Sequence, residues 1–185
     1  MQLLILSDGE LPAPLRSQIL AAVRREWPED FDDEHRDRPW IQRAQFHPTH
    51  VVLVEDDRLI AYAGVVSKDL AHAGETYRTY GLSGVVAAPA LRRQGHGRRV
   101  VEAATALIRA SDADIGLLRC PPSLTAFYAA CGWEPIAGAT LFGGPADASA
   151  LERTQAVMMG FFSEKGRAGR ESFAAEPIYF DDDLW

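Results

Sequence analysis

The feature that most constrains the fold is a series of extended segments that leads into a glycine-bearing basic turn and then an amphipathic helix. Two apolar, β-branched runs within residues 51–66 flank a short polar stretch, which predicts a β-hairpin. A further strand is predicted over residues 76–87, and it ends at Pro89, which cannot donate to a ladder. Apolar residues then recur on one face as far as Ala110, which predicts a helix.

The remaining patterns complete a mixed arrangement of strands and helices. They predict a strand at residues 3–6, helices at 15–23, 30–46 and 123–132, and extended segments at 115–118, 133–142 and 154–162. Because hairpins are mixed with one crossover, the predicted fold class is α/β, with a mixed, mostly antiparallel central sheet flanked by helices. We expect a single domain over residues 1–185, in which residues 163–185 form a polar loop and a docked acidic C-terminal tail.

Composition excludes several classes of protein. A length of 185 residues with 47% apolar residues supports one sizeable core. The net charge of -7 disfavours nucleic-acid binding, and two cysteines, Cys120 and Cys131, predict neither a disulfide scaffold nor a metal site. No apolar run is long enough to span a bilayer and the N-terminus lacks a basic n-region, so we expect no membrane association and a cytoplasmic location. Trp133 and residues 157–162 fit either a core or the surface of a homodimer.

The segment most informative about chemistry is Arg92-Arg93-Gln94-Gly95-His96-Gly97, which joins the strand ending near residue 87 to the amphipathic helix. Glycines allow the backbone to approach an oxygen-rich ligand, and a helix N-terminus adds partial positive charge, so this turn predicts a diphosphate site. It lacks the third glycine of a dinucleotide fingerprint and the Gly-Lys-Ser/Thr of a phosphate-binding NTPase loop. A basic turn without a ligand is the alternative.

On these residues the chain resembles the GCN5-related N-acetyltransferase (GNAT) superfamily, whose Arg/Gln-x-x-Gly-x-Gly/Ala turn cradles the pyrophosphate of acetyl-CoA. The segment from Ser123 to Trp133 resembles the family's Phe-Tyr-x-x-x-Gly-Phe element. The resemblance implies that acetyl-CoA is the co-substrate and that Tyr128 lies by the departing sulfur. The cofactor-binding residues that it implies are Val85, Val86, Ala87, Arg92, Arg93, Gln94, Gly95, His96, Gly97 and Arg98.

A narrower resemblance, over most of the chain, is to the aminoglycoside 2′-N-acetyltransferases. It is carried by Asp30-Phe31, by Gly84-Val85-Val86-Ala87, by the Tyr128 element and by a terminal Asp183-Leu184-Trp185. It implies a cationic amino-sugar acceptor, which a cleft with several carboxylates would concentrate. The substrate-binding candidates are Asp30, Asp33, Glu34, Asp182, Asp183 and the carboxylate of Trp185; for each one alone, a solvated acidic surface is the alternative.

One departure from the family concerns the base. Where its members commonly carry a glutamate, this chain has Ser83 before Gly84, so Ser83 is a catalytic candidate only as the holder of a relay water. Other bases considered are Asp30, His35, His47 and Glu75. One carboxylate fewer fits an aminoglycoside of lower charge, such as kasugamycin, at least as well as the usual 2′-amino aminoglycosides.

Two other functions remain open. An acetyltransferase for a polyamine, a small amine or a peptide N-terminus would use the same coenzyme turn. A non-catalytic acetyl-CoA-binding module is the second alternative, because Ser83 stands where a carboxylate is expected, although Tyr128 argues against it.

Overall fold

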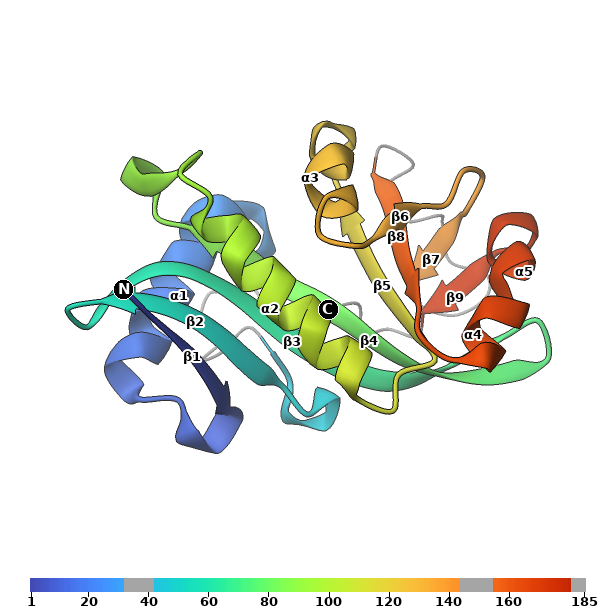
Figure 1. Ribbon diagram of the computed structural model, residues 1–185, viewed down its shortest axis with the longest axis horizontal. Helices are drawn as coiled ribbons and strands as arrows, with labels where there is room; N and C mark the ends of the chain where they lie inside the picture. The colour runs from blue at the N-terminus through green and yellow to red at the C-terminus, as the bar shows by residue number, and fades with distance from the viewer. Residues whose placement is uncertain (32–41, 144–154, 181–185) are drawn as a thin grey trace. The chain divides into compact units, whose positions relative to one another are not determined.

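The computed structural model describes residues 1–31, 42–143 and 155–180, which fold as alternating strands and helices (Figure 1). In chain order these elements are β1 (Gln2–Ser7), η1 (Asp8–Glu10), α1 (Ala13–Glu26), η2 (Pro28–Phe31), η3 (Ala44–Phe46), β2 (Thr49–Glu55), β3 (Arg58–His72), β4 (Glu75–Ala87), η4 (Pro89–Leu91), α2 (His96–Ala110), β5 (Ile115–Cys120), η5 (Pro122–Leu124), α3 (Thr125–Ala129), β6 (Glu134–Pro135), β7 (Leu141–Gly143), β8 (Ala156–Phe161), α4 (Glu164–Ala168), α5 (Arg170–Ala175) and β9 (Ile178–Phe180).

The described strands form a seven-stranded sheet in the order β1-β2-β3-β4-β5-β8-β6, with β7 and β9 paired separately. Antiparallel pairing joins β1 to β2, β2 to β3, β5 to β8 and β6 to β8. The pair β4–β5 is parallel, because α2 forms the crossover between these two strands. The predicted class, a mixed and mostly antiparallel sheet flanked by helices, is confirmed.

The predicted hairpin is also confirmed. Asp56 and Asp57 have φ values of +47° and +60°, the backbone conformation of a tight two-residue turn that aspartate tolerates. The second strand, β3, continues well past residue 66 to His72, because apolar and polar residues still alternate beyond the fully apolar run.

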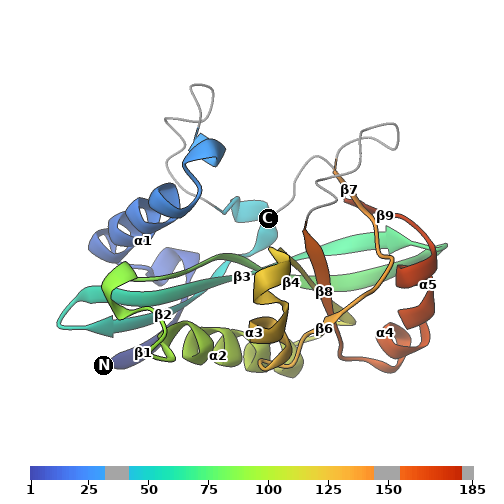
Figure 2. The ribbon, with the colours of Figure 1, turned by 90° about the horizontal axis from the view of Figure 1, so that it is seen from above.

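The chain divides into two compact units. Unit 1 comprises Met1–Val66 and Leu82–Ala104. On one face of its strands, Leu15, Ile19 and Val23 of α1 pack in a buried cluster whose other members are Leu11, Val52, Val54, Tyr62 and Val86. Figure 2 shows α1 on one side of β1 and β2 and the first part of α2 on the other.

Unit 2 comprises Ser67–Gly81 and Thr105–Trp185. Its core gathers residues that are distant in sequence: Leu70, Tyr77, Ile115, Leu117, Ile136, Leu141, Val157, Met159, Phe173, Ile178 and Phe180. Phe173, Ile178 and Phe180 are completely buried, so the last described elements belong to this core.

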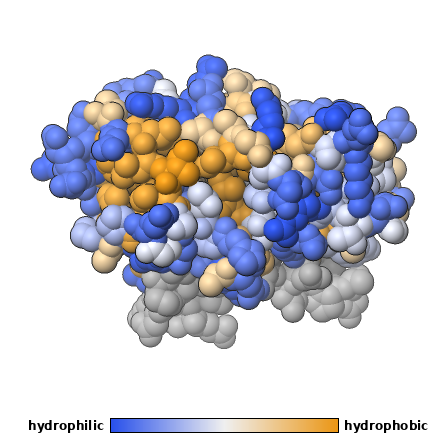
Figure 3. All heavy atoms as spheres, turned by 60° about the horizontal axis from the view of Figure 1, so that its bottom comes forward, coloured by the Kyte–Doolittle hydropathy of each residue, from blue (hydrophilic) through white to orange (hydrophobic). Residues whose placement is uncertain are grey.

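The face drawn in Figure 3 is largely hydrophilic, with an apolar patch on the left of the view. Among the described residues, the large apolar side chains with the highest exposure are Met1, Ile5, Leu124 and Tyr179. Single exposed apolar side chains of this kind are normal in folded proteins.

Three local predictions were wrong. The segment 164–180 is not a loop but forms α4, α5 and β9, because Ser163 accepts a hydrogen bond from the amide of Gly166 and caps α4. The extended segment at 133–142 is interrupted after β6, where Gly138 has a φ of +85°. The helix from Asp30 to Phe46 is not continuous: residues 28–31 and 44–46 form short 3-10 helices, and residues 32–41 lie outside the described residues.

The close approach of α4 to the start of β5 generates a stability prediction. A Cβ on Gly166 would meet the carbonyl of Asp114, which is backbone and cannot move aside easily. Alanine normally favours a helix over glycine by about 1 kcal/mol, but overpacking costs about 1–3 kcal/mol, so Gly166→Ala should lower the free energy of unfolding. Denaturant unfolding measures this, with Gly9→Ala as the control, because a Cβ there meets nothing within 4 Å. Equal stability of the two variants would contradict the assignment.

Candidate functional site

The C-terminal part of β4 has backbone that is free of its parallel neighbour. The β4–β5 register joins Thr79–Gly81 to Ile115–Leu117 and stops there, so residues 82–87 take no part in it. Ser83, Gly84 and Val85 are half-buried, whereas Val86 is buried against α1. Gly84 has a φ of +61°, which distorts the strand at a position where a side chain would be strained.

The turn that follows β4 leads directly into α2. Arg93 and Gly95 have φ values of +61° and +85°. A Cβ on Gly95 would meet nothing within 4 Å, so the positive φ, and not a lack of space, favours glycine at this position. The first helical bond of α2 runs from the amide of Arg99 to the carbonyl of Gly95, at 3.0 Å. The amides of His96 and Gly97, in the first turn, therefore have no acceptor within the helix. Such an end is suited to an anion.

The basic side chains of this segment have different roles. Arg92 forms an ion pair with Glu26 at the end of α1 and donates from Nε to the carbonyl of Ala87, at 3.4 Å, so its side chain holds the turn in place. Arg98 pairs with Glu102 one helical turn later, with Nε 2.7 Å from Oε1. Arg93 and Gln94 are exposed. The side chain of Arg92 therefore links the turn to α1 and to the end of β4, and the exposed Arg93 adds a positive charge beside it.

Tyr128 lies in unit 2, on the short helix α3. The backbone carbonyl of Tyr128 accepts hydrogen bonds from the amides of Cys131 and Trp133. Gly132 follows the helix with a φ of +92°, the left-handed conformation that commonly ends a helix. The predicted helix over residues 123–132 is shorter in the structure, because Pro122–Leu124 form a 3-10 turn and α3 begins at Thr125. Tyr128 itself is only 7% exposed. Burial raises the pKa of the Tyr128 hydroxyl, and the thiols of Cys120 and Cys131 act in the same direction, so the phenol keeps its proton near neutral pH.

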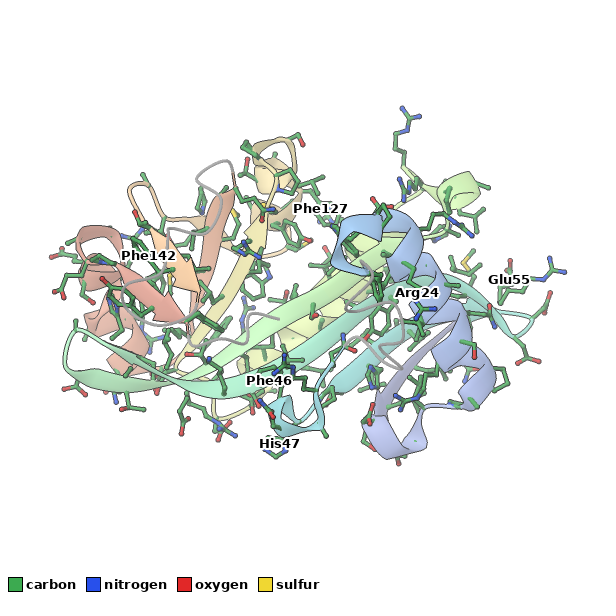
Figure 4. All side chains as sticks on the ribbon, turned by 180° about the vertical axis from the view of Figure 1, so that it is seen from behind. Arg24, Phe46, His47, Glu55, Phe127 and Phe142 are labelled. Carbon is green, nitrogen blue, oxygen red and sulfur yellow. The ribbon has the colours of Figure 1, made fainter. Side chains whose placement is uncertain are left out.

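Most of the predicted acceptor residues fall outside the described part of the chain. These are Asp33, Glu34, Asp182, Asp183 and Trp185; Asp30 lies in η2, without a described side chain. Of the bases considered, Glu75 is 3.3 Å from Lys165 in an exposed ion pair. His47 follows η3, and Figure 4 shows its ring directed away from the sheet while the neighbouring Phe46 points inward. His35 is not described.

Sequence reasoning missed a polar cluster inside unit 1. His50 on β2 and Tyr62 on β3 are both 0% exposed, and their polar atoms Nδ1 and Oη are 2.9 Å apart. The other ring nitrogen of His50, Nε2, lies 3.1 Å from Oδ1 of Asp8. The signal was present, because a histidine and a tyrosine interrupt two apolar strands on the face that α1 covers.

The described residues hold no cluster of three or more potential metal ligands. Cys120 and Cys131 are both buried and are not joined by a disulfide. In the same described segments, every helix is too short or too polar to cross a membrane.

Comparisons with known proteins agree with this geometry. The model of the acetyltransferase (GNAT) family matches residues 16–133, which contain both the Arg92–Gly97 turn and Tyr128. No curated protein sequence matches the chain. Among solved structures, Escherichia coli ElaA superposes with a TM-score of 0.62 and 16% identity, covering 86% of this chain and 98% of that protein.

Two further structures share the fold. An aminoglycoside 6′-N-acetyltransferase complexed with coenzyme A has a TM-score of 0.59 and 14% identity, over 86% of this chain and 97% of that one. Tetrahymena GCN5 has a TM-score of 0.58 and 9% identity, over 88% and 97%. The family model covers more than half of the chain and includes the turn at the start of α2, and on that basis the chain belongs to the GNAT family of acetyltransferases.

Proposed function

We propose that this N-acetyltransferase transfers the acetyl group of acetyl-CoA to the 2′-amino group of an aminoglycoside, of the kasugamycin type or another, and thereby confers resistance to it. The observation that carries the coenzyme half of the proposal is the glycine-bearing turn between β4 and α2. The acceptor half rests on the narrower sequence resemblance and on the acidic character of the chain, which has a net charge of -7.

The residues of β4 and of the turn fit acetyl-CoA. A diphosphate would accept hydrogen bonds from the amides of His96 and Gly97, while Arg93 and Arg98 supply positive charge nearby. The backbone of Val85 and Ala87, free of the β5 ladder, would bind the amides of the pantetheine arm as an added strand does. Bound acetyl-CoA supplies the acetyl group as an activated thioester.

Tyr128 would hold the proton that the leaving sulfur requires. In the transfer, a C–N bond forms to the neutral acceptor amine and the C–S bond breaks; the phenol gives its proton to the thiolate, and the proton that the nitrogen loses on becoming an amide restores the phenol. The raised pKa of Tyr128 keeps the hydroxyl protonated before the reaction and makes it ready to regain a proton afterwards. This role follows from the family resemblance and from the burial of the phenol.

The acceptor would be held by carboxylates. Aminoglycosides carry several ammonium and hydroxyl groups, and carboxylates bind both through charge-assisted hydrogen bonds. Asp30, Asp33, Glu34, Asp182, Asp183 and the carboxylate of Trp185 are the proposed set. That a structure with this fold acts on an aminoglycoside, at the 6′ position, supports the chemical class and leaves the position to experiment.

The test is a panel of acceptors incubated with acetyl-CoA and followed by mass spectrometry and thiol release. The panel contains kasugamycin, 2′-amino and 2′-hydroxy aminoglycosides, spermidine, and a peptide with a free N-terminus. We expect a gain of one acetyl group on kasugamycin or on the 2′-amino compounds alone. Acetylation of spermidine or the peptide instead, or no acetylation of any acceptor, would overturn the proposal.

A substitution in the turn between β4 and α2 tests the proposed coenzyme site. Gly97→Glu places a carboxylate where the diphosphate would lie, so we expect the Kd for acetyl-CoA to rise by about 10- to 100-fold, the equivalent of losing one charge-assisted hydrogen bond. Calorimetry measures the Kd. The matched control is Ala106→Glu, which adds the same charge on an exposed position of the same helix. An unchanged Kd in folded Gly97→Glu would rule out the turn as the coenzyme site.

A substitution at Tyr128 tests its proposed role as proton donor. Tyr128→Phe retains the buried ring and removes the proton donor, so kcat should fall by about 10- to 100-fold, toward the low end for general acid catalysis because thiolate is a fair leaving group. The Kd for acetyl-CoA should stay the same. Tyr179→Phe, on an exposed tyrosine of β9, is the control. A wild-type kcat in Tyr128→Phe would show that the residue is structural.

A further inference from the structure

Unit 2 contains a pocket that the proposed transfer does not use. It has a volume of about 560 Å³ and is lined by three exposed arginines: Arg109 near the end of α2, Arg167 in α4 and Arg170 at the start of α5. Sites for small molecules usually have volumes of about 300–1,000 Å³, so this pocket is large enough for one. The turn proposed for the coenzyme precedes the first residue of α2 and is not part of the pocket.

The apolar wall of the pocket is aromatic and is held in place. Gly116 of β5 and Gly160 of β8 lie directly opposite each other. A Cβ on Gly116 would be 2.9 Å from the rings of both Phe162 and Trp133, and both rings line the pocket. The Trp133 indole also donates from Nε1 to Oγ1 of Thr105, at 2.8 Å. The two rings therefore form a flat apolar surface that is already ordered before a ligand binds.

One of the three arginines is already paired. Arg170 binds Glu134, which also lines the pocket, with Nε 3.2 Å from Oε1 and Nη2 2.7 Å from Oε2. The Arg170 guanidinium also lies over the ring of Phe161, 5.9 Å from its centroid. Because this pair is close to neutral, the excess positive charge of the pocket comes from Arg109 and Arg167.

Arg109 and Arg167 have guanidinium groups available for an anion. Within the described residues, the side chain of Arg109 has neither an ion pair nor a hydrogen bond. Its Nη2 lies 3.2 Å from where a Cβ on Gly132 would be, so it reaches the pocket over a residue without a side chain. Arg167 donates from Nη1 to the carbonyl of Phe162 at 3.2 Å, which positions its guanidinium and leaves further N–H groups for a ligand.

We propose that this pocket binds a small organic anion with a flat aromatic body. The carboxylate or phosphate of the ligand pairs with Arg109 and Arg167, because a guanidinium matches the geometry of either group. The aromatic body lies on the rings of Phe162 and Trp133. A cationic amine is repelled by the same charges, so the acceptor of the proposed reaction is not the ligand of this pocket. The inference does not depend on the proposed function, since none of these residues has a role in the transfer.

The first test compares the affinities of matched probes by calorimetry. Naphthoate and naphthyl phosphate have the flat body and the charge; naphthamide lacks the charge, and acetate and inorganic phosphate lack the body. We expect at least one naphthyl anion to bind about 10-fold or more tightly than these three controls, because it makes both kinds of contact. The tighter of the two identifies the anionic group that the pocket prefers. Equal binding of naphthamide, or no binding of either naphthyl anion, would overturn the proposal.

The second test removes the positive charges one at a time. Arg109→Gln and Arg167→Gln should each raise the Kd for the tighter naphthyl anion by about 5-fold, near the upper end for an ion pair open to solvent. Arg99→Gln removes the same charge from an exposed position of α2 and is the matched control. Gly97→Glu, in the coenzyme turn, should also leave this Kd unchanged. A Kd that rises in Gly97→Glu, or that stays the same in both Arg109→Gln and Arg167→Gln, would overturn the proposal.

The third test blocks the pocket without changing its charge. Ala129 lines the pocket at an exposed position of α3, so Ala129→Trp should abolish binding of the naphthyl anion. Ala126→Trp adds the same side chain to an exposed residue of α3 that does not line the pocket, and should not change the Kd. Equal affinity of the two variants would contradict the assignment.

The site of binding is mapped in the unmodified protein. Nitrogen-15 NMR should show the largest changes in amide shift at Ala129, Gly132 and Gly160 when the naphthyl anion is added, because these residues line the pocket. Largest changes elsewhere would overturn the proposal. Size-exclusion chromatography tests the alternative occupant: a dimer that Ala129→Trp dissociates would assign this surface to a second copy of the chain and would also overturn it.

Discussion

Strand β4 carries the constraint on which the rest of this structure depends. Its first half must pair with β5, and residues 79–81 do so in a parallel ladder. Its second half, residues 82–87, lies beyond that ladder, and in the proposed function its backbone groups bind the coenzyme arm. Gly84, with its positive φ, lies in this second half, and the turn after Ala87 continues into the N-terminus of α2.

The packing around this strand differs between the two units. In unit 2, aromatic rings stabilise the core: Phe173 stacks on His72 at 4.2 Å between centroids and meets Tyr77 edge-on at 5.1 Å. In unit 1, α1 covers an apolar face that nevertheless contains His50 and Tyr62. These two polar side chains avoid the cost of burial by their hydrogen bonds, from His50 to Tyr62 and to Asp8.

The two chemical tasks of the proposed reaction use different means. The coenzyme side depends on backbone geometry and needs little more than glycines, a helix end and one phenol. The acceptor side depends on titratable side chains, because it must remove a proton from an amine. For that reason the coenzyme motif is visible as a short sequence pattern, whereas the proposed acceptor carboxylates are divided between residues 30–34 and residues 182–185.

The sequence by itself determined the hairpin, the glycine turn, the long helix and the Tyr128 element, because each depends on residues that are close to one another in the sequence. It did not reveal α4 and α5, because Phe173 is the one large apolar residue of α5 and its partners in the core are distant in sequence. Nor did it reveal the Asp8–His50–Tyr62 chain. Asp8 and His50 are 42 positions apart, and the β1–β2 and β2–β3 pairings together with the position of η1 bring them into contact. Only tertiary structure decides which distant polar residues share a buried space.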